Sequence, residues 1–148
     1  TTQTMLREYY IHYVKWLADL IRTEHKEYFI IVKIHPNELV EKDGQLSGNE
    51  NVFISKDNLE MLLAITSIHI TIYSTTLFDA LNFDLVNFSL QAKVYSDYAK
   101  TMVDSKIALP LGENEDPVNK ALQANATGNI INPEFIYSKF NQKILSEL

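Results

Sequence analysis

Hydrophobic and polar positions change their spacing several times along this chain. In residues 6–21 apolar side chains recur every three or four positions, which predicts a long amphipathic helix with Thr2 or Thr4 as its cap. Residues 28–34 form an almost continuous apolar run instead, as expected for a parallel strand that is covered on both faces. The chain is therefore expected to open on a helix and to continue into a buried strand.

The alternation of strand and helix patterns continues to the end of the chain. A polar stretch over residues 38–51 predicts a surface loop, and an apolar run over residues 68–73 predicts a central strand. The other expected elements are strands at residues 52–54, 84–88 and 107–109, helices at residues 59–65 and 75–81, a loop that becomes a short helix within residues 91–104, and helices that begin at Asp116 and Asn132. This order predicts an α/β fold, a Rossmann-like and mostly parallel sheet with helices on both faces.

The junction after the central strand carries the candidate chemistry. Its apolar residues stop at Ser74, Thr75 and Thr76, and a helical pattern then begins. A turn of this kind presents backbone N–H groups and hydroxyls at the positive end of a helix, which suits a phosphate. Asp79 follows about one helical turn later and is expected at the rim of the same crevice. Ordinary capping of the helix would give the same pattern, and Asp79 could simply be a first-turn acid, so these alternatives stay open.

A second candidate follows the first predicted strand. His35 precedes Pro36, which favours an extended backbone and directs the imidazole away from the sheet edge. Because the carboxyl ends of parallel strands share one edge of a sheet, we expect His35 and Ser74 to converge there. The alternative is a loop histidine that packs on its proline. His69, inside the central strand, is interpreted as a hydrogen-bonded residue of the sheet rather than a ligand.

Composition narrows the classes of function. The 148 residues suffice for one domain, residues 1–148, and the net charge of −6 disfavours broad attraction to nucleic acid or anionic lipid. The chain has no cysteine, which excludes disulfides, thiolate catalysis and cysteine-bound metals and fits a reducing compartment. No apolar run is long enough to cross a bilayer, and no glycine-rich phosphate loop is present. An anion must therefore be held by a few local groups.

Two segments carry a family resemblance: VKIHPNE at residues 32–38 and IYSTTLFDAL at residues 72–81. Together they resemble the C-terminal, nucleotide-binding half of GT-B glycosyltransferases. The likeness is greatest to bacterial surface-polysaccharide enzymes, namely capsule transferases, polysialyltransferases and teichoic-acid glycerophosphotransferases. Those proteins carry a K-x-H-P strand end and, further along, a Ser-Ser or Ser-Thr turn followed by an acidic residue, usually glutamate where this chain has Asp79.

The resemblance implies a role for each candidate residue. His35 would contact the donor phosphate and act in catalysis, while Ser74, Thr75 and Thr76 would hold that phosphate through their hydroxyls and the helix start. Asp79 would reach the ribose or the sugar. The implied function is donor binding in a glycosyltransferase of surface-polysaccharide biosynthesis. The implied substrate is a CMP- or UDP-linked nucleotide sugar, and no metal or other cofactor is required.

The same resemblance implies a larger protein. An N-terminal half would supply the glycan acceptor site and the catalytic base, so we expect this chain to be a fragment that is inactive alone. We also expect a cytoplasmic location with no nucleic-acid partner and no membrane span; a peripheral position at the inner membrane stays open. Two alternatives remain. One is a hydrolysing nucleotide-sugar 2-epimerase, and the other is a non-catalytic nucleotide- or glycan-binding module that contacts a partner through Tyr9, Tyr13 and Trp16.

Overall fold

The computed structural model of the 148-residue chain describes residues 2–33, 46, 49–72, 74–93 and 96–127. The chain falls into two compact units, Thr1–Leu59 and Glu60–Leu148, and each is described by itself. Parallel strands form two sheets flanked by helices, which confirms the predicted α/β, Rossmann-like class. The strand pairing is divided between two sheets rather than continuous through one. The single domain stays a prediction.

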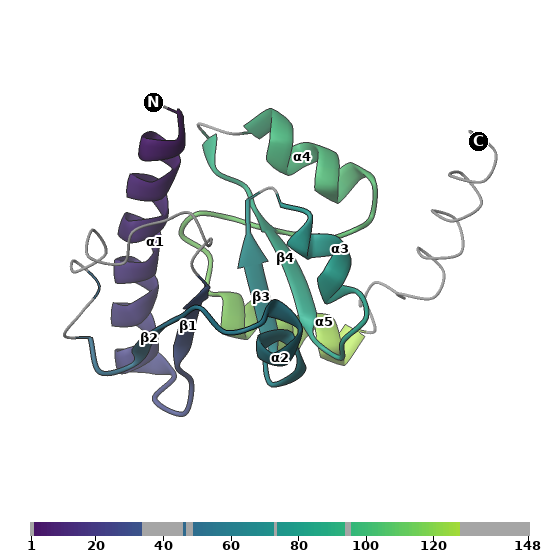
Figure 1. Ribbon diagram of the computed structural model, residues 1–148. Helices are drawn as coiled ribbons and strands as arrows, with labels where there is room; N and C mark the ends of the chain where they lie inside the picture. Colours follow the sequence, from purple (N-terminus) through teal and green to yellow (C-terminus); the bar gives the residue numbers. More distant parts are fainter. Residues whose placement is uncertain (1, 34–45, 47–48, 73, 94–95, 128–148) are drawn as a thin grey trace. The chain divides into compact units, whose positions relative to one another are not determined.

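The first unit is a helix and a two-stranded parallel sheet (Figure 1). Helix α1 spans Thr2–Glu24, strand β1 spans Ile30–Lys33 and strand β2 spans Val52–Ser55. The register runs in step from Ile30 opposite Val52 to Lys33 opposite Ser55. The long helix and both strands lie where the hydrophobic spacing predicts them.

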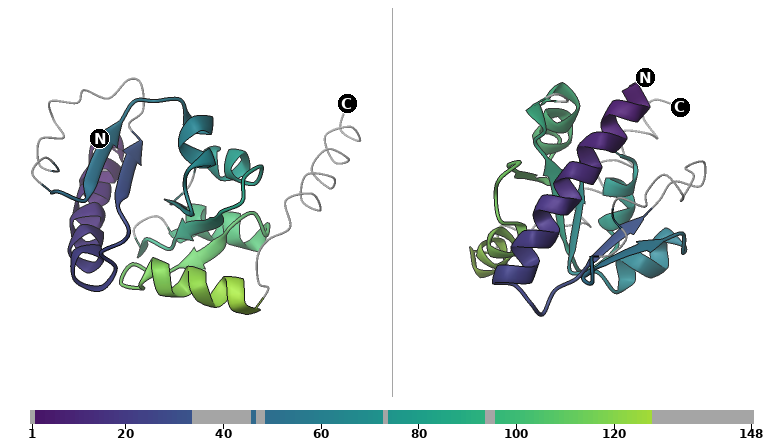
Figure 2. Two further views of the ribbon diagram at one scale, coloured as in Figure 1. Left: turned by 90° about the horizontal axis from the view of Figure 1, so that it is seen from below. Right: turned by 90° about the vertical axis from the view of Figure 1, so that its left-hand side faces the viewer.

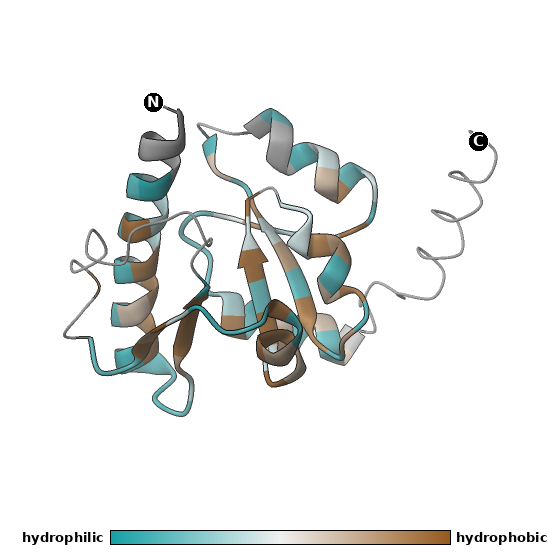
Figure 3. Cartoon of the chain, viewed as in Figure 1, coloured by the Kyte–Doolittle hydropathy of each residue, from teal (hydrophilic) through white to brown (hydrophobic). Residues whose placement is uncertain are grey.

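The core of this unit follows from the twofold repeat of a strand. Figure 3 shows that β1 and β2 are hydrophobic. Alternate strand residues point to the same face, and one face of this sheet packs on α1. The packed residues are Ile11, Val14, Leu46, Ile30, Val32, Val52 and Ile54. The other face carries Phe29 and Phe53, which are 58% and 54% exposed, with ring centroids 5.5 Å apart in an edge-to-face arrangement.

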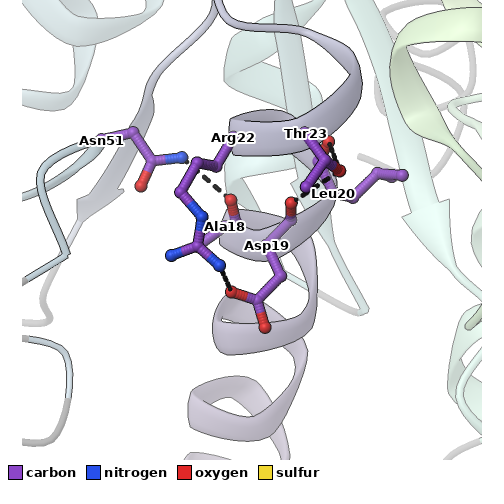
Figure 4. A network of polar contacts seen from close by, with 6 residues as sticks. All are labelled: Ala18, Asp19, Leu20, Arg22, Thr23 and Asn51. Atoms are coloured by element: carbon purple, nitrogen blue, oxygen red, sulfur yellow. Dashed lines mark hydrogen bonds and ion pairs between the residues drawn. The ribbon is translucent and has the colours of Figure 1, made fainter.

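Asn51 joins the two strands to the helix. Its carbonyl accepts the N–H of Ile30 at 2.8 Å, and its side-chain Nδ2 donates to the carbonyl of Ala18 in α1 at 3.0 Å (Figure 4). The neighbouring ion pair between Arg22 and Asp19, 2.6 Å long, lies in solvent with both side chains about two-thirds exposed. Solvent screens such a pair, so the half-buried amide is expected to contribute more to stability.

The second unit is built on a three-stranded parallel sheet in the order β3-β4-β5. Strand β3 spans Ile68–Thr71, β4 spans Val86–Leu90 and β5 spans Leu109–Leu111. Every residue of the central strand β4 is buried, because helices cover both of its faces. Figure 2 shows α3 and α5 on opposite sides of this sheet.

In the described residues, one helix precedes these strands, two connect them and one follows β5. They are α2 (Leu59–Ala64), α3 (Thr76–Ala80), α4 (Ser96–Asp104) and α5 (Pro117–Thr127). Side chains of α3 and α4 share a buried cluster made of Leu77, Leu81, Met102, Ile107 and Ala108. Within the described residues, no helix combines the length and apolarity that a bilayer crossing requires.

The start of α5 confirms a sequence prediction in detail. Asp116 Oδ1 accepts the N–H groups of Val118 at 2.9 Å and Asn119 at 3.2 Å. Pro117 occupies the first helical position, where the missing N–H has no helical partner to lose. An aspartate before a proline therefore begins this helix, as expected.

Strands β4 and β5 both lie two residues later than predicted. Asp84 is exposed in a turn, and pairing begins only where the N–H of Val86 donates to the carbonyl of Ser67 at 2.9 Å. Pro110 lies inside β5 rather than after it. It is tolerated because β5 is an edge strand, where one side of the backbone needs no ladder donor. The helix predicted from Asn132 lies outside the described residues.

Replacing Asn51 with alanine is expected to lower the free energy of unfolding by about 1 kcal/mol, because the half-buried hydrogen bond from its side chain to the carbonyl of Ala18 is lost. Arg22→Ala, a matched change at the exposed ion pair, is expected to cost about 0.5 kcal/mol or less. Urea unfolding followed by circular dichroism measures both. Equal losses would show that the Asn51 link does not hold this unit together.

Candidate functional site

The chain leaves β3 along a path that the central strand β4 determines. Ser89 of β4 is fully buried, and its Oγ donates to the carbonyl of Ile72 at 2.8 Å. Ile72 is itself only 2% exposed. The residue that follows β3 is thus held by a hydrogen bond and by packing, which fixes where the turn at Ser74 begins.

Within the turn, most backbone N–H groups already have acceptors. The N–H of Thr76 donates to Ser74 Oγ at 3.2 Å, and the N–H of Leu77 donates to the Ser74 carbonyl at 3.1 Å. The N–H groups of Phe78 and Asp79 donate to the Thr75 carbonyl at 3.0 and 3.4 Å. The N–H groups of residues 76–79 are therefore not free for a phosphate, contrary to the prediction from the turn pattern. The N-cap is Thr75, and its side chain makes no capping bond, so capping and phosphate binding by the hydroxyls both stay open. Helix α3 is also only five residues long, so its dipole contributes little.

The groups that remain for a ligand are mainly hydroxyls. Thr75 is exposed, has a helical backbone conformation and makes no capping bond with its side chain. The Ser74 hydroxyl accepts one bond from Thr76, which leaves its own proton available to an anion. Asp79 is exposed on the same short helix. Ser74, Thr75, Thr76 and Asp79 thus lie in one turn and the short helix that follows it. That they hold a ligand stays a prediction.

A buried polar network lies directly beneath this turn. Asn87 of β4 faces His69 of β3 across the sheet, and its Oδ1 lies 2.8 Å from His69 Nδ1. Its Nδ2 donates to the carbonyls of Leu77 at 2.9 Å and Ile107 at 3.2 Å. On the other side of the ring, His69 Nε2 lies 3.4 Å from Thr76 Oγ1. This confirms the interpretation of His69 as a hydrogen-bonded residue of the sheet.

Burial sets the charge state of His69. Desolvation lowers the pKa of its imidazole, whereas the hydrogen bond to Asn87 Oδ1 and the charge of Asp79 oppose that shift more weakly. The neutral ring is therefore the form that the fold favours.

At the ends of β4 and β5, backbone N–H groups donate to glutamate side chains. The N–H of Lys93, after β4, donates to Glu113 Oε1 at 2.6 Å, and the N–H of Gly112, after β5, donates to Glu115 Oε1 at 2.7 Å. Glu115 also accepts from Lys120 Nζ at 2.9 Å. The bond from Gly112, followed by that from Lys120, lowers the pKa of the Glu115 carboxyl. The carboxyl edge of this sheet is thus tied together by side-chain acceptors.

His35 lies outside the described residues, so its convergence with Ser74 stays a prediction. Lys33, at the end of β1, is exposed and donates from Nζ to the carbonyl of Lys56 at 3.2 Å. Among the described residues, no group of three or more histidine, cysteine or acidic side chains is placed to hold a metal.

Sequence reasoning missed Asn87 and Ser89. Their signal is present in the run Val86–Leu90, where two polar residues alternate with apolar ones in a strand that is otherwise buried. Alternation places both on one face of the sheet. A buried asparagine or serine needs partners, so this pattern could have indicated a polar network.

The fold and the turn together define an α/β protein with a hydroxyl-bearing loop at the carboxyl end of a parallel strand. A family model described as CDP-glycerol:poly(glycerophosphate) glycerophosphotransferase matches residues 3–141. The chain belongs to this family. The match spans both resemblance segments and supports the likeness to teichoic-acid enzymes. No curated protein and no solved structure matches the chain.

We expect Asn87→Ala to lower the free energy of unfolding by about 3 kcal/mol, because three buried groups lose their partner at once. Asn119→Ala, at an exposed position of α5, is the matched control and is expected to stay within about 0.5 kcal/mol of the native chain. Denaturant titration at pH 7.5 gives both values. A loss at Asn87 no larger than at Asn119 would contradict the network.

His69 should make stability depend on pH. Its pKa is lower in the folded chain than in the unfolded chain, so the unfolded state binds more protons between the two values. Stability is therefore expected to fall as the pH drops through the ordinary histidine range, near 6.5, towards the lowered folded pKa. Thermal unfolding between pH 7.5 and 5.5 measures this slope. The dependence of stability on pH should be weaker in His69→Gln than in the native chain. His12→Gln, which removes an exposed histidine, is the matched control and should keep the native slope. Equal slopes in all three proteins would argue against the role of His69.

Proposed function

We propose that this chain binds the nucleotide-activated donor of a transferase that extends a surface polymer. The observation that carries the proposal is the family match over residues 3–141. Its description names CDP-glycerol as the donor and poly(glycerophosphate) as the acceptor. A cytidine nucleotide is one of the two donor types that the sequence resemblance implies, and glycerol takes the place of the expected sugar.

The chemistry of such a transfer can be written from the two substrates. A terminal hydroxyl of the polymer attacks the glycerol-bearing phosphorus of CDP-glycerol. The new P–O bond forms as the bond from that phosphorus to the bridging oxygen breaks, and CMP leaves with the electron pair. The hydroxyl proton passes to a base, which we assign to the N-terminal half that the resemblance implies. The leaving group gains negative charge during this step, so donors placed at the diphosphate stabilise the transition state.

The proposed roles within this chain follow from that charge. The turn that contains Ser74, Thr75 and Thr76 supplies hydroxyl contacts to the diphosphate from one or more of these three side chains. His35 supplies a cationic or hydrogen-bonding imidazole. Asp79 accepts a hydrogen bond from a hydroxyl of the ribose or the glycerol. These contacts need no bound metal, and the reaction takes place on the cytoplasmic side, where the nucleotide donor is made.

Titration calorimetry of the 148-residue chain with CDP-glycerol and with CMP tests the proposal. Ser74→Ala and His35→Ala are each expected to weaken binding about tenfold or more, because a hydrogen bond to a charged group is lost. Ser67→Ala removes an exposed serine at the opposite end of β3 and should leave the affinity unchanged.

A further titration with a UDP-sugar separates the alternatives. Tighter binding of the UDP-sugar than of CDP-glycerol would favour the epimerase, and binding of no nucleotide would favour the non-catalytic module in its glycan-binding form. Unchanged affinity in Ser74→Ala and His35→Ala would remove the assigned site even if the nucleotide binds.

A further inference from the structure

The side-chain amide of Asn87 has a defined orientation. Two of its neighbours are backbone carbonyls, those of Leu77 and Ile107, and a carbonyl can only accept a hydrogen bond. The NH₂ group must therefore face them, so the amide oxygen faces His69. Both amide hydrogens are used, and Oδ1 is the only atom of this side chain that His69 Nδ1 can meet.

This orientation selects the tautomer of His69. Because Asn87 Oδ1 is an acceptor, Nδ1 must carry the proton that it donates. In the neutral ring Nε2 then has a lone pair and no proton. The group that faces Nε2 is the hydroxyl of Thr76, at 3.4 Å, so the Thr76 hydroxyl must donate.

A hydroxyl has one proton and two lone pairs, so this bond decides what Thr76 can offer to a ligand. Its proton points inward to His69, and only lone pairs remain for the ligand side. Phosphate oxygens are acceptors and gain nothing from lone pairs. Ser74 differs, because its Oγ accepts from the Thr76 N–H and keeps its own proton available. Thr75 is exposed and makes no capping bond with its hydroxyl.

We infer that His69, oriented by Asn87, is a positioning residue that directs the Thr76 hydroxyl proton away from the ligand, so that Ser74 and Thr75 are the hydroxyl donors to the donor diphosphate. Thr76 then ties the turn to the sheet and makes no favourable contact with phosphate. This inference rests on the proposed function, and it refines the expectation that all three hydroxyls hold the phosphate. Among the described residues, Asp79 on α3 is the charged side chain that acts on the ring of His69.

The tautomer can be tested without any ligand. Histidine ring ¹⁵N correlation spectra of the labelled chain at pH 7.5 distinguish a protonated Nδ1 from a protonated Nε2, and the signals that His69→Gln removes identify this ring. We expect Nδ1 protonated and Nε2 unprotonated. A proton on Nε2, with Nδ1 bare or protonated, would overturn the inference whatever the chain binds.

The division of donors can be tested by calorimetry with CDP-glycerol. Ser74→Ala and Thr75→Val are expected to weaken binding about tenfold each, whereas Thr76→Val, which preserves side-chain shape, should change the affinity less than about twofold. In the background of His69→Phe the Thr76 hydroxyl is released, and there Thr76→Val should weaken binding by about threefold or more. If His69 had only a structural role, Thr76→Val would change the affinity equally in the native chain and in His69→Phe.

The outcomes separate this inference from the proposed function. If CDP-glycerol binds and all three hydroxyl variants weaken it equally, the inference is wrong and the donor site stands. If the native chain binds neither CDP-glycerol nor CMP, the proposed function and the division of donors both fall. Should His69→Phe not fold, the native-background comparison of Thr75→Val with Thr76→Val decides alone.

Discussion

The side chain of Asn87 is the contact on which the second unit depends. One amide in the buried central strand donates to carbonyls at the ends of two other segments and accepts from His69 on the adjacent strand. In a buried site of low dielectric, each of these bonds is stronger than in water, and an unpaired member would be costly. The strand β3, the short helix α3 and the segment that enters β5 are therefore held in one arrangement by a single side chain.

This arrangement explains how so short a helix can support a functional turn. Helix α3 has too few residues to be stable by itself, and its first N–H groups are already used by Ser74 and Thr75. Its position comes instead from Leu77, which is fully buried, and from the polar network beneath it. The position of α3 is thus set by contacts with the sheet, and donors that are already in place lose little free energy when they meet a charged ligand.

The family match concerns the class of reaction, whereas the hydrogen-bond network of Asn87, His69 and Thr76 concerns which groups can contact a ligand. Membership in the glycerophosphotransferase family supports a transferase role in the synthesis of a surface polymer. The proposed division of hydroxyl donors depends on the network, because tautomer and amide orientation decide where each proton points. Threonine and serine side chains that look equivalent in a sequence motif can differ in whether the hydroxyl proton is available to a ligand, because largely buried residues such as His69 can accept a hydrogen bond from that hydroxyl.

The sequence alone determined the α/β class, the parallel strands and the long first helix, because each follows from the local spacing of apolar residues. It also determined the cap of α5 by Asp116 and the grouping of Ser74, Thr75, Thr76 and Asp79, because these residues are neighbours in the chain. It did not determine the late starts of β4 and β5 or the division into two sheets, because pairing partners far apart in the chain set those. Asn87 and Ser89 acquired their roles only in the tertiary structure. Their backbone partners, Ile72, Leu77 and Ile107, are brought within hydrogen-bond distance by strand order, and no local pattern encodes that proximity.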